Sequence, residues 1–157
     1  MSVWRPHTTG ILIGGVVLIL IALVTVYVLN NFRATTDVRL GSGVFSARVA
    51  KTDAERQKGL SGVEKLDASE GLLMVFDKSD IYGIWMKDMK IPIDVIWLDS
   101  EKKVVHIVMD AQPELGDSKT FNSKQPAKYV FEVPAGTVKG AAIKIGDKAT
   151  FNVEGAK

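Results

Sequence analysis

The sequence contains no cysteine. This absence excludes disulfide bonds, thiol catalysis and zinc sites with cysteine ligands. Only two histidines are present, and a long apolar run separates His7 from His106. A histidine-rich metal site within one domain is therefore excluded, and we expect neither a metal nor a cofactor.

Several functional signatures are also missing. There is no G-x-S-x-G elbow, P-loop, dinucleotide-binding fingerprint or H-E-x-x-H motif, which argues against the common hydrolases and nucleotide-using enzymes. The 20 Lys and Arg residues are interspersed with 18 Asp and Glu residues, for a net charge of +2. Nucleic-acid binding needs a concentrated cationic face, so we expect no nucleic-acid partner.

What the sequence does contain is a long apolar run over residues 10–29, without one charged side chain. As a helix it would be roughly 30 Å long, which matches the hydrocarbon core of a bilayer. The run is longer than the apolar part of a signal peptide, and Asn30 and Asn31 do not form a small-residue cleavage site. We predict a transmembrane helix over 10–29 after a short tail, 1–9; a cleaved signal is the alternative.

The charges beside this segment do not decide its orientation. Arg5 and the α-amino group precede the segment, and Arg33 and Arg39 follow it. Because a short tail is easily retained inside, we expect a single-pass protein of the cell membrane with its larger domain outside the cytoplasm.

Two glycines near the start of the predicted span have the spacing of a helix-packing motif. Gly10 and Gly14 form a G-x-x-x-G pattern, which lets membrane helices approach closely. The pattern is typical of a homodimer face or of a contact with another membrane protein. Glycines are also ordinary near the ends of membrane helices, so both interpretations stay open.

The rest of the chain reads as a polar linker, residues 30–43, followed by one soluble domain, residues 44–157. Thr52 and Glu55 form a capping box, which predicts a short helix that ends at Gly59. A second short helix is expected near 137–142, and the apolar patterns predict strands over 44–50, 71–76, 82–86, 91–98, 104–109, 128–133 and 149–153.

These elements predict the fold class. The stretch 91–98 (IPIDVIWL) is nearly apolar on both faces, so we expect it to be a central strand. The class is α+β and mostly β: one small domain with a curled, mainly antiparallel sheet or open barrel of about seven strands, two short helices and the N-terminal transmembrane helix.

One polar stretch, residues 110–126, has no periodicity. Structureless loops of this length are uncommon in small domains and are often functional or disordered. Phe121 is its only aromatic residue. We interpret the stretch as a lid or contact loop, or else as a mobile excursion.

Four pieces of the domain resemble a known family. They are the pair Gly59–Leu60, GLLMVF at 71–76, WMKDMKIPIDVIWLD at 85–99, and AKYVFEVPAG at 127–136 with the later Gly146–Asp147. In order and spacing they resemble the domain of unknown function 192 family of bacteria and archaea. The resemblance implies a compact, strand-rich domain and transfers no activity. Asp88 departs from the pattern, because many relatives carry Asn there.

Asp94 is the most conspicuous candidate for chemistry, because it lies within the most apolar predicted strand. A buried carboxylate needs a partner, and Lys87 is the nearest cation expected in the same region. One hypothesis is a Lys87–Asp94 pair at the mouth of a ligand pocket. The alternative is that Asp94 accepts backbone amides around the turn at 90–92. The ligand-binding candidates are Trp85, Lys87, Asp88, Asp94, Trp97 and Phe121.

Glu132 is a second carboxylate, within the predicted strand 128–133. Two carboxylates about 5 to 10 Å apart suit glycoside hydrolysis, with Lys87 adjusting the charge of Asp94 and Glu132. The alternative is that Glu132 occupies a solvent-facing position on an alternating strand.

The function we expect from the sequence is a membrane-anchored, non-catalytic binding or accessory module of the cell envelope. One alternative is a hydrolase of envelope polymers that uses Asp94 and Glu132. Another is a subunit of a membrane complex, joined through Gly10 and Gly14.

Overall fold

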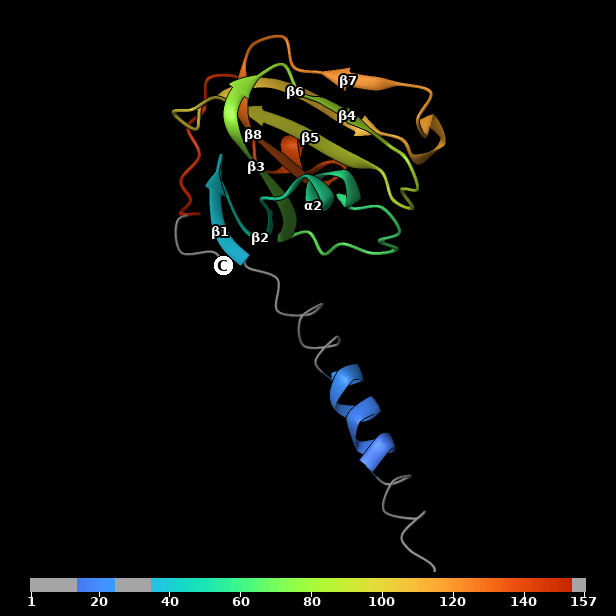
Figure 1. The fold of residues 1–157 in the computed structure, drawn as a ribbon. Helices are drawn as coiled ribbons and strands as arrows, with labels where there is room; N and C mark the ends of the chain where they lie inside the picture. Colours follow the sequence, from blue (N-terminus) through green and yellow to red (C-terminus); the bar gives the residue numbers. More distant parts are fainter. Residues whose placement is uncertain (1–13, 25–34, 154–157) are drawn as a thin grey trace, which may run out of the picture. The chain divides into compact units, whose positions relative to one another are not determined.

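The structure is a computed structural model that describes residues 14–24 and 35–153 (Figure 1). The chain divides into two units, Met1–Arg33 and Ala34–Lys157. In the first unit, residues 14–24 are helical. The rest of the predicted span 10–29, with Gly10 and the tail 1–9, lies outside the described residues. Among the residues that are described, no helix has both the length and the apolar character needed to cross a bilayer.

The second unit is built on a mixed six-stranded sheet (Figure 1). All neighbouring strands are antiparallel except β2 and β3, which pair in parallel. The order across the sheet is β1 (Thr35–Leu40), β2 (Gly43–Ala50), β3 (Glu70–Asp80), β8 (Ala127–Pro134), β5 (Ile93–Leu98) and β6 (Val104–Ala111). A separate two-stranded sheet contains β4 (Gly83–Trp85) and β7 (Thr120–Asn122). The prediction of a mostly β domain is confirmed.

The few helices are short. Helix α2 (Asp53–Lys58) begins at the predicted capping box: the Thr52 hydroxyl accepts from the Glu55 amide, and the Glu55 carboxylate accepts from the Thr52 amide. It ends at Gly59, whose φ of 49° favours glycine. The 3₁₀ helix η1 (Pro113–Leu115) and helix α3 (Thr137–Gly140) are the other helices in the described part of the second unit.

The structure differs from the sequence prediction at both ends of the domain. Strand β1 lies within the predicted linker 30–43, because Val38 and Leu40 alternate with polar residues and are buried. The predicted last strand, 149–153, is not a strand. Instead, Thr150 exchanges backbone hydrogen bonds with Arg39 of β1, and the Ala149 amide donates to the Lys102 carbonyl beside β6. The segment thus links the two edge strands of the sheet.

The polar stretch 110–126 also has more structure than its sequence suggests. It holds the end of β6, the helix η1 and strand β7. Phe121 of β7 pairs with Ile84 of β4 and is half-buried, so it packs against the domain rather than forming an exposed tip.

Apolar side chains cover both faces of the sheet. Because side chains alternate along a strand, the central strands β5 and β8 contribute to two cores. All six residues of β5 are buried, as predicted for a central strand. One core contains Ile96, Leu98, Phe131 and Val133 with the C-terminal residues Val138, Ile143 and Phe151. The other contains Val95, Trp97 and Val130 with Leu60, Met74, Ile84, Met86 and Met89.

Asp94 of β5 is a structural residue. It is 1% exposed, and its two carboxylate oxygens accept the backbone amides of Asp110 at 2.9 Å and Val138 at 2.8 Å. The interpretation that Asp94 accepts backbone amides is therefore confirmed, although the donors are not those of the turn at 90–92. The other hypothesis, a Lys87–Asp94 pair, does not agree with the structure: Lys87 is exposed, and the Asp94 oxygens accept from the end of β6 and the start of α3.

The substitution Asp94→Asn tests this role. An amide side chain offers one oxygen instead of two, so one buried backbone N–H loses its acceptor, and we expect a loss of about 1–3 kcal/mol in the free energy of unfolding. Urea unfolding of the full chain in non-ionic detergent measures it. Asp88→Asn is the control, because Asp88 is exposed and its φ of 56° suits Asn, and it should leave the midpoint unchanged. Equal midpoints for both variants would contradict the assignment.

Candidate functional site

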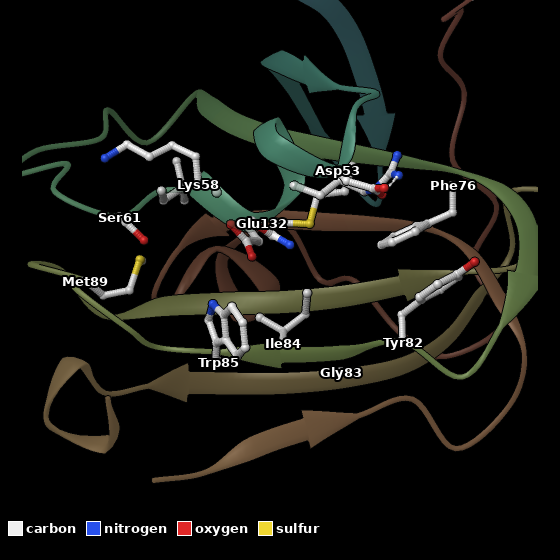
Figure 2. Close-up of a pocket in the computed structure, with 15 residues that line it drawn as sticks. Asp53, Lys58, Ser61, Phe76, Tyr82, Gly83, Ile84, Trp85, Met89 and Glu132 are labelled. Atoms are coloured by element: carbon white, nitrogen blue, oxygen red, sulfur yellow. Dashed lines mark hydrogen bonds and ion pairs between the residues drawn. The ribbon is translucent and has the colours of Figure 1, made fainter. Parts of the chain in front are cut away.

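A cavity of about 210 Å³ lies beside the end of α2, on the face of the sheet that carries Val95 and Trp97. Figure 2 shows Glu132 of β8 near its centre, between α2 and the strand that carries Ile84 and Trp85. Phe76 and Tyr82 lie toward one end, and Ser61 and Met89 toward the other. Most of the lining surface is apolar, and of the two acids that line the cavity Asp53 is exposed and Glu132 is buried.

The sheet register places Glu132 in this enclosure. Glu132 pairs with Leu72 of β3 on one side and with Val95 of β5 on the other. Side chains directly opposite each other project from the same face of a sheet, so Glu132 lies on the face that carries these two apolar residues. It is 3% exposed, which shows that the solvent-facing interpretation is wrong. The reason is that β8 lies between two strands and is covered on both faces.

The Glu132 carboxyl is not satisfied by the protein. Its Oε2 atom is buried and has no hydrogen-bond partner within residues 14–24 and 35–153. A Cβ atom built on Gly59 would lie 3.8 Å from Oε2 and 3.5 Å from the Met74 methyl group, so glycine keeps this side of the cavity open. An unpaired buried polar atom is costly, and such atoms are a minority in folded proteins.

The surroundings also change the ionisation of Glu132. Burial raises the pKa of Glu132 to about 8, and the positive charge of Arg48 on β2 lowers it by a smaller amount. Arg48 lies on the same face of the sheet, because it pairs with Leu72, which pairs with Glu132. With a pKa near 8, the carboxyl is mostly protonated at neutral pH and ionises a little above it.

One end of the cavity is aromatic. The Phe76 and Tyr82 rings stack with centroids 3.5 Å apart, and the Arg56 guanidinium lies 4.9 Å from the Phe76 centroid. Arg56 also donates to the Val75 carbonyl at 2.7 Å and pairs with Asp53, which holds this wall in place. The pKa of the Tyr82 hydroxyl is raised by burial and, to a lesser extent, by the negative charge of Asp80.

The two tryptophans proposed from the sequence have different environments. Trp85 of β4 lines the cavity and is 47% exposed, so one part of its ring is accessible to a ligand. Trp97 of β5 is fully buried, and its indole N–H donates to the Tyr82 carbonyl at 3.0 Å. The Trp97 ring is part of the core and does not line this cavity.

Of the residues proposed from the sequence, Trp85 and Glu132 come together at the cavity. Lys87, Asp88, Asp94, Trp97 and Phe121 are not among the residues that line it. The sequence analysis missed Met74, Ile84 and Gly59. A signal for Gly59 was available, because the glycine that ends α2 stands in one of the four pieces that carry the family resemblance.

Asp94 and Glu132 cannot act as a catalytic pair. Asp94 pairs with Val133, and Glu132 pairs with Val95. The two acids are therefore offset by one residue in the register of adjacent strands. Their side chains therefore project from opposite faces of the sheet. The hydrolase hypothesis that uses both residues is wrong for this reason.

A metal site has no support in the described ranges, 14–24 and 35–153, where no group of three His, Cys, Asp or Glu residues could hold an ion. The cavity is lined by the carboxyl group of Glu132, whose pKa of about 8 lies close to neutral pH. In its protonated form it can donate a hydrogen bond, and in its ionised form it can bind a cation.

The pKa of Glu132 predicts how stability depends on pH. In the folded state the pKa of Glu132 is raised to about 8, whereas the ordinary pKa of the side chain is 4.5. Protonation of Glu132 therefore makes its full contribution to the free energy of unfolding below pH 4.5. As the pH rises from there toward 8, this contribution falls by about 1.4 kcal/mol per pH unit. Relative to wild type, Glu132→Gln should gain on the order of 4 kcal/mol between pH 4.5 and pH 8.

Urea unfolding at several pH values measures this difference. Glu101→Gln is the control, because Glu101 is exposed and its difference from wild type should stay flat. A flat difference for Glu132→Gln as well would contradict the raised pKa.

Comparisons with known proteins agree with this architecture. A family model, DUF192, described as an uncharacterized ACR, matches residues 35–151. A UPF0127 protein of Pyrococcus furiosus is 31% identical over 74 residues, which is 47% of this chain and 57% of that protein. A UPF0127 protein of Pyrococcus abyssi is 43% identical over 71 residues, 45% of this chain and 54% of that protein. The match thus spans little more than half the length of these curated relatives.

Solved structures are similar over most of the domain. A protein of unknown function from Novosphingobium aromaticivorans has a TM-score of 0.68 and 30% identity, covering 74% of this chain and 83% of that one. A protein from Sinorhizobium meliloti, described as a proposed transcription regulator, has a TM-score of 0.72 and 26% identity, covering 76% and 95%. Because the family model covers β1 through Phe151, the chain belongs to the DUF192 family, a family without an assigned function.

Proposed function

We propose that the chain is a binding module whose cavity beside α2 takes a small ligand group with an apolar body and a polar end directed at Glu132. The observation that carries this proposal is the buried Oε2 atom of Glu132, which has no hydrogen-bond partner among the described residues and belongs to a side chain that lines the cavity. A ligand that supplies the missing hydrogen bond would remove the cost of leaving this oxygen unpaired.

The lining of the cavity supports a ligand of limited size. Binding sites for small molecules are concave and mostly apolar, with few polar groups that fix orientation. Here Met74, Ile84 and Trp85 supply apolar surface, and Glu132 supplies the polar contact. A volume of about 210 Å³ suits a single ring or an amino-acid side chain better than a polymer.

We further propose that this module is tethered to the cell membrane by residues 10–29 and faces the cell envelope. The support is the sequence itself, which has no charge over that stretch and is long enough to span a bilayer. A homodimer or membrane-protein contact through Gly10 and Gly14 is compatible with this tether.

The test of the binding proposal uses the methionine methyl groups as reporters. Met74 and Met89 line the cavity, whereas Met109 is 63% exposed elsewhere. In the full chain, labelled with ¹³C at the methionine methyls and held in non-ionic detergent, phenol, indole, benzamide and benzyl alcohol are titrated singly. We expect at least one compound to shift the Met74 and Met89 signals saturably and to leave Met109 unchanged.

Trp85→Ala should weaken this binding roughly 2- to 12-fold, because one aromatic contact contributes about 0.5–1.5 kcal/mol. Ile145→Ala is the control, since Ile145 is also exposed and does not line the cavity, and it should bind as the wild type does. The proposal is overturned when no compound gives a saturable shift, or when Trp85→Ala binds with undiminished affinity.

The tether is tested by cell fractionation. The full chain should stay with membranes after a high-salt, alkaline wash, because an apolar span of this length is held by the hydrocarbon core. A variant with Leu18→Lys and Leu20→Lys should move to the wash fraction, since charged residues at the centre of a span are costly. A full chain that washes off as readily as this variant would contradict the tether.

A further inference from the structure

We infer that the ligand group received by Glu132 is an ammonium carried on an apolar or aromatic body. This inference rests on the proposed function of the cavity and adds the chemical class of its ligand. It follows from how the carboxyl and the nearby cations are arranged in Figure 2.

The cations that line the cavity leave Oε2 of Glu132 unpaired. The Arg56 guanidinium pairs with Asp53 and donates to the Val75 carbonyl. The Lys58 side chain is directed away from Glu132 in Figure 2, and its ammonium lies 3.8 Å from a Cβ built on Gly62. Neither cation therefore pairs with Oε2, and a cation from outside the chain would reach it through the cavity that Glu132 lines.

An ammonium fits this position better than a neutral donor does. It offers up to three N–H groups and a full positive charge, and hydrogen bonds between ions are roughly twice as strong as neutral ones. Inside an apolar enclosure the attraction between opposite charges is also less screened than in water. Trp85, with its accessible ring, adds a surface that attracts cations through its π face.

The rest of the ligand is also constrained. Met74, Ile84 and Trp85 supply most of the apolar lining, so the body of the ligand should be largely apolar. An anionic group in the cavity would be repelled by the carboxyl of Glu132 once that carboxyl is ionised. Asp53 and Lys58 also line the cavity and are exposed to solvent, so the part of a ligand that extends outward would lie near one negative and one positive charge.

This pairing makes binding depend on pH. The carboxyl must lose its proton to pair with an ammonium, so affinity should rise as the pH approaches the pKa of Glu132, about 8. Below that value each pH unit changes the ionised fraction about tenfold. The charged or titratable groups around Glu132 are Arg48 from β2, Asp53, Arg56 and Lys58 from α2, and Tyr82 next to β4.

The experiment compares benzylamine with benzyl alcohol, which has nearly the same shape and no charge. Both are titrated into the full chain at pH 6, 7 and 8, with the Met74 and Met89 methyl signals as the readout. Benzylamine affinity should rise about 50-fold from pH 6 to pH 8, following the ionised fraction of Glu132. Benzyl alcohol affinity should stay within about twofold, because it pairs with either form of the carboxyl.

Glu132→Gln provides the matched variant, since it keeps the shape of the side chain and removes its charge. At pH 8 it should lower benzylamine affinity at least about tenfold and abolish the pH dependence, with benzyl alcohol affinity within about twofold of wild type. If this variant fails to fold, the wild-type pH series alone decides the question.

The outcomes separate the two proposals. When both compounds shift Met74 and Met89 with equal affinity at every pH, the ammonium inference is overturned and the binding cavity stands. When neither they nor the earlier compounds shift these signals, the proposed function fails, and the inference fails with it.

Discussion

The interaction on which the site depends is the hydrogen bonding of β8 to strands on both of its sides. Pairing with β3 and β5 fixes the register of β8 and leaves it no edge. Every second residue must then enter the apolar layer that contains Leu72 and Val95. Glu132 occupies one of these positions. Strand pairing therefore places its carboxyl in the apolar layer, although a carboxyl group by itself is more stable in water.

The domain contains two buried carboxyl groups on adjacent strands, and the difference between them separates structure from function. Asp94 receives two backbone amides, which connect β5 to the end of β6 and to α3. Glu132 lines the cavity and has a buried oxygen without a hydrogen-bond partner in the described part of the chain. A satisfied acid stabilises the fold, whereas an unsatisfied acid in a cavity retains binding capacity for another molecule.

Much of the fold could be predicted from local patterns, since capping and burial are encoded within a few residues. Examples are the capping box of α2 and the burial of β5 on both faces. Other features depend on which strands become neighbours, and the alternation of polar and apolar residues within one strand does not contain that information. These features are the parallel pairing of β2 with β3 and the burial of Glu132. The same limit explains why Trp85 and Trp97 seemed equivalent in the sequence, although only one lines the cavity.

The central claim is that the fold holds a carboxylic acid protonated at neutral pH next to an open cavity. Titration of the Glu132 side-chain carboxyl by ¹³C NMR, assigned by its loss in Glu132→Gln, tests this claim most directly. The account predicts a midpoint near pH 8 in the folded protein, because burial disfavours the charged form. A midpoint near the ordinary pKa of 4.5 would show that Glu132 is solvated or paired, and would contradict the account.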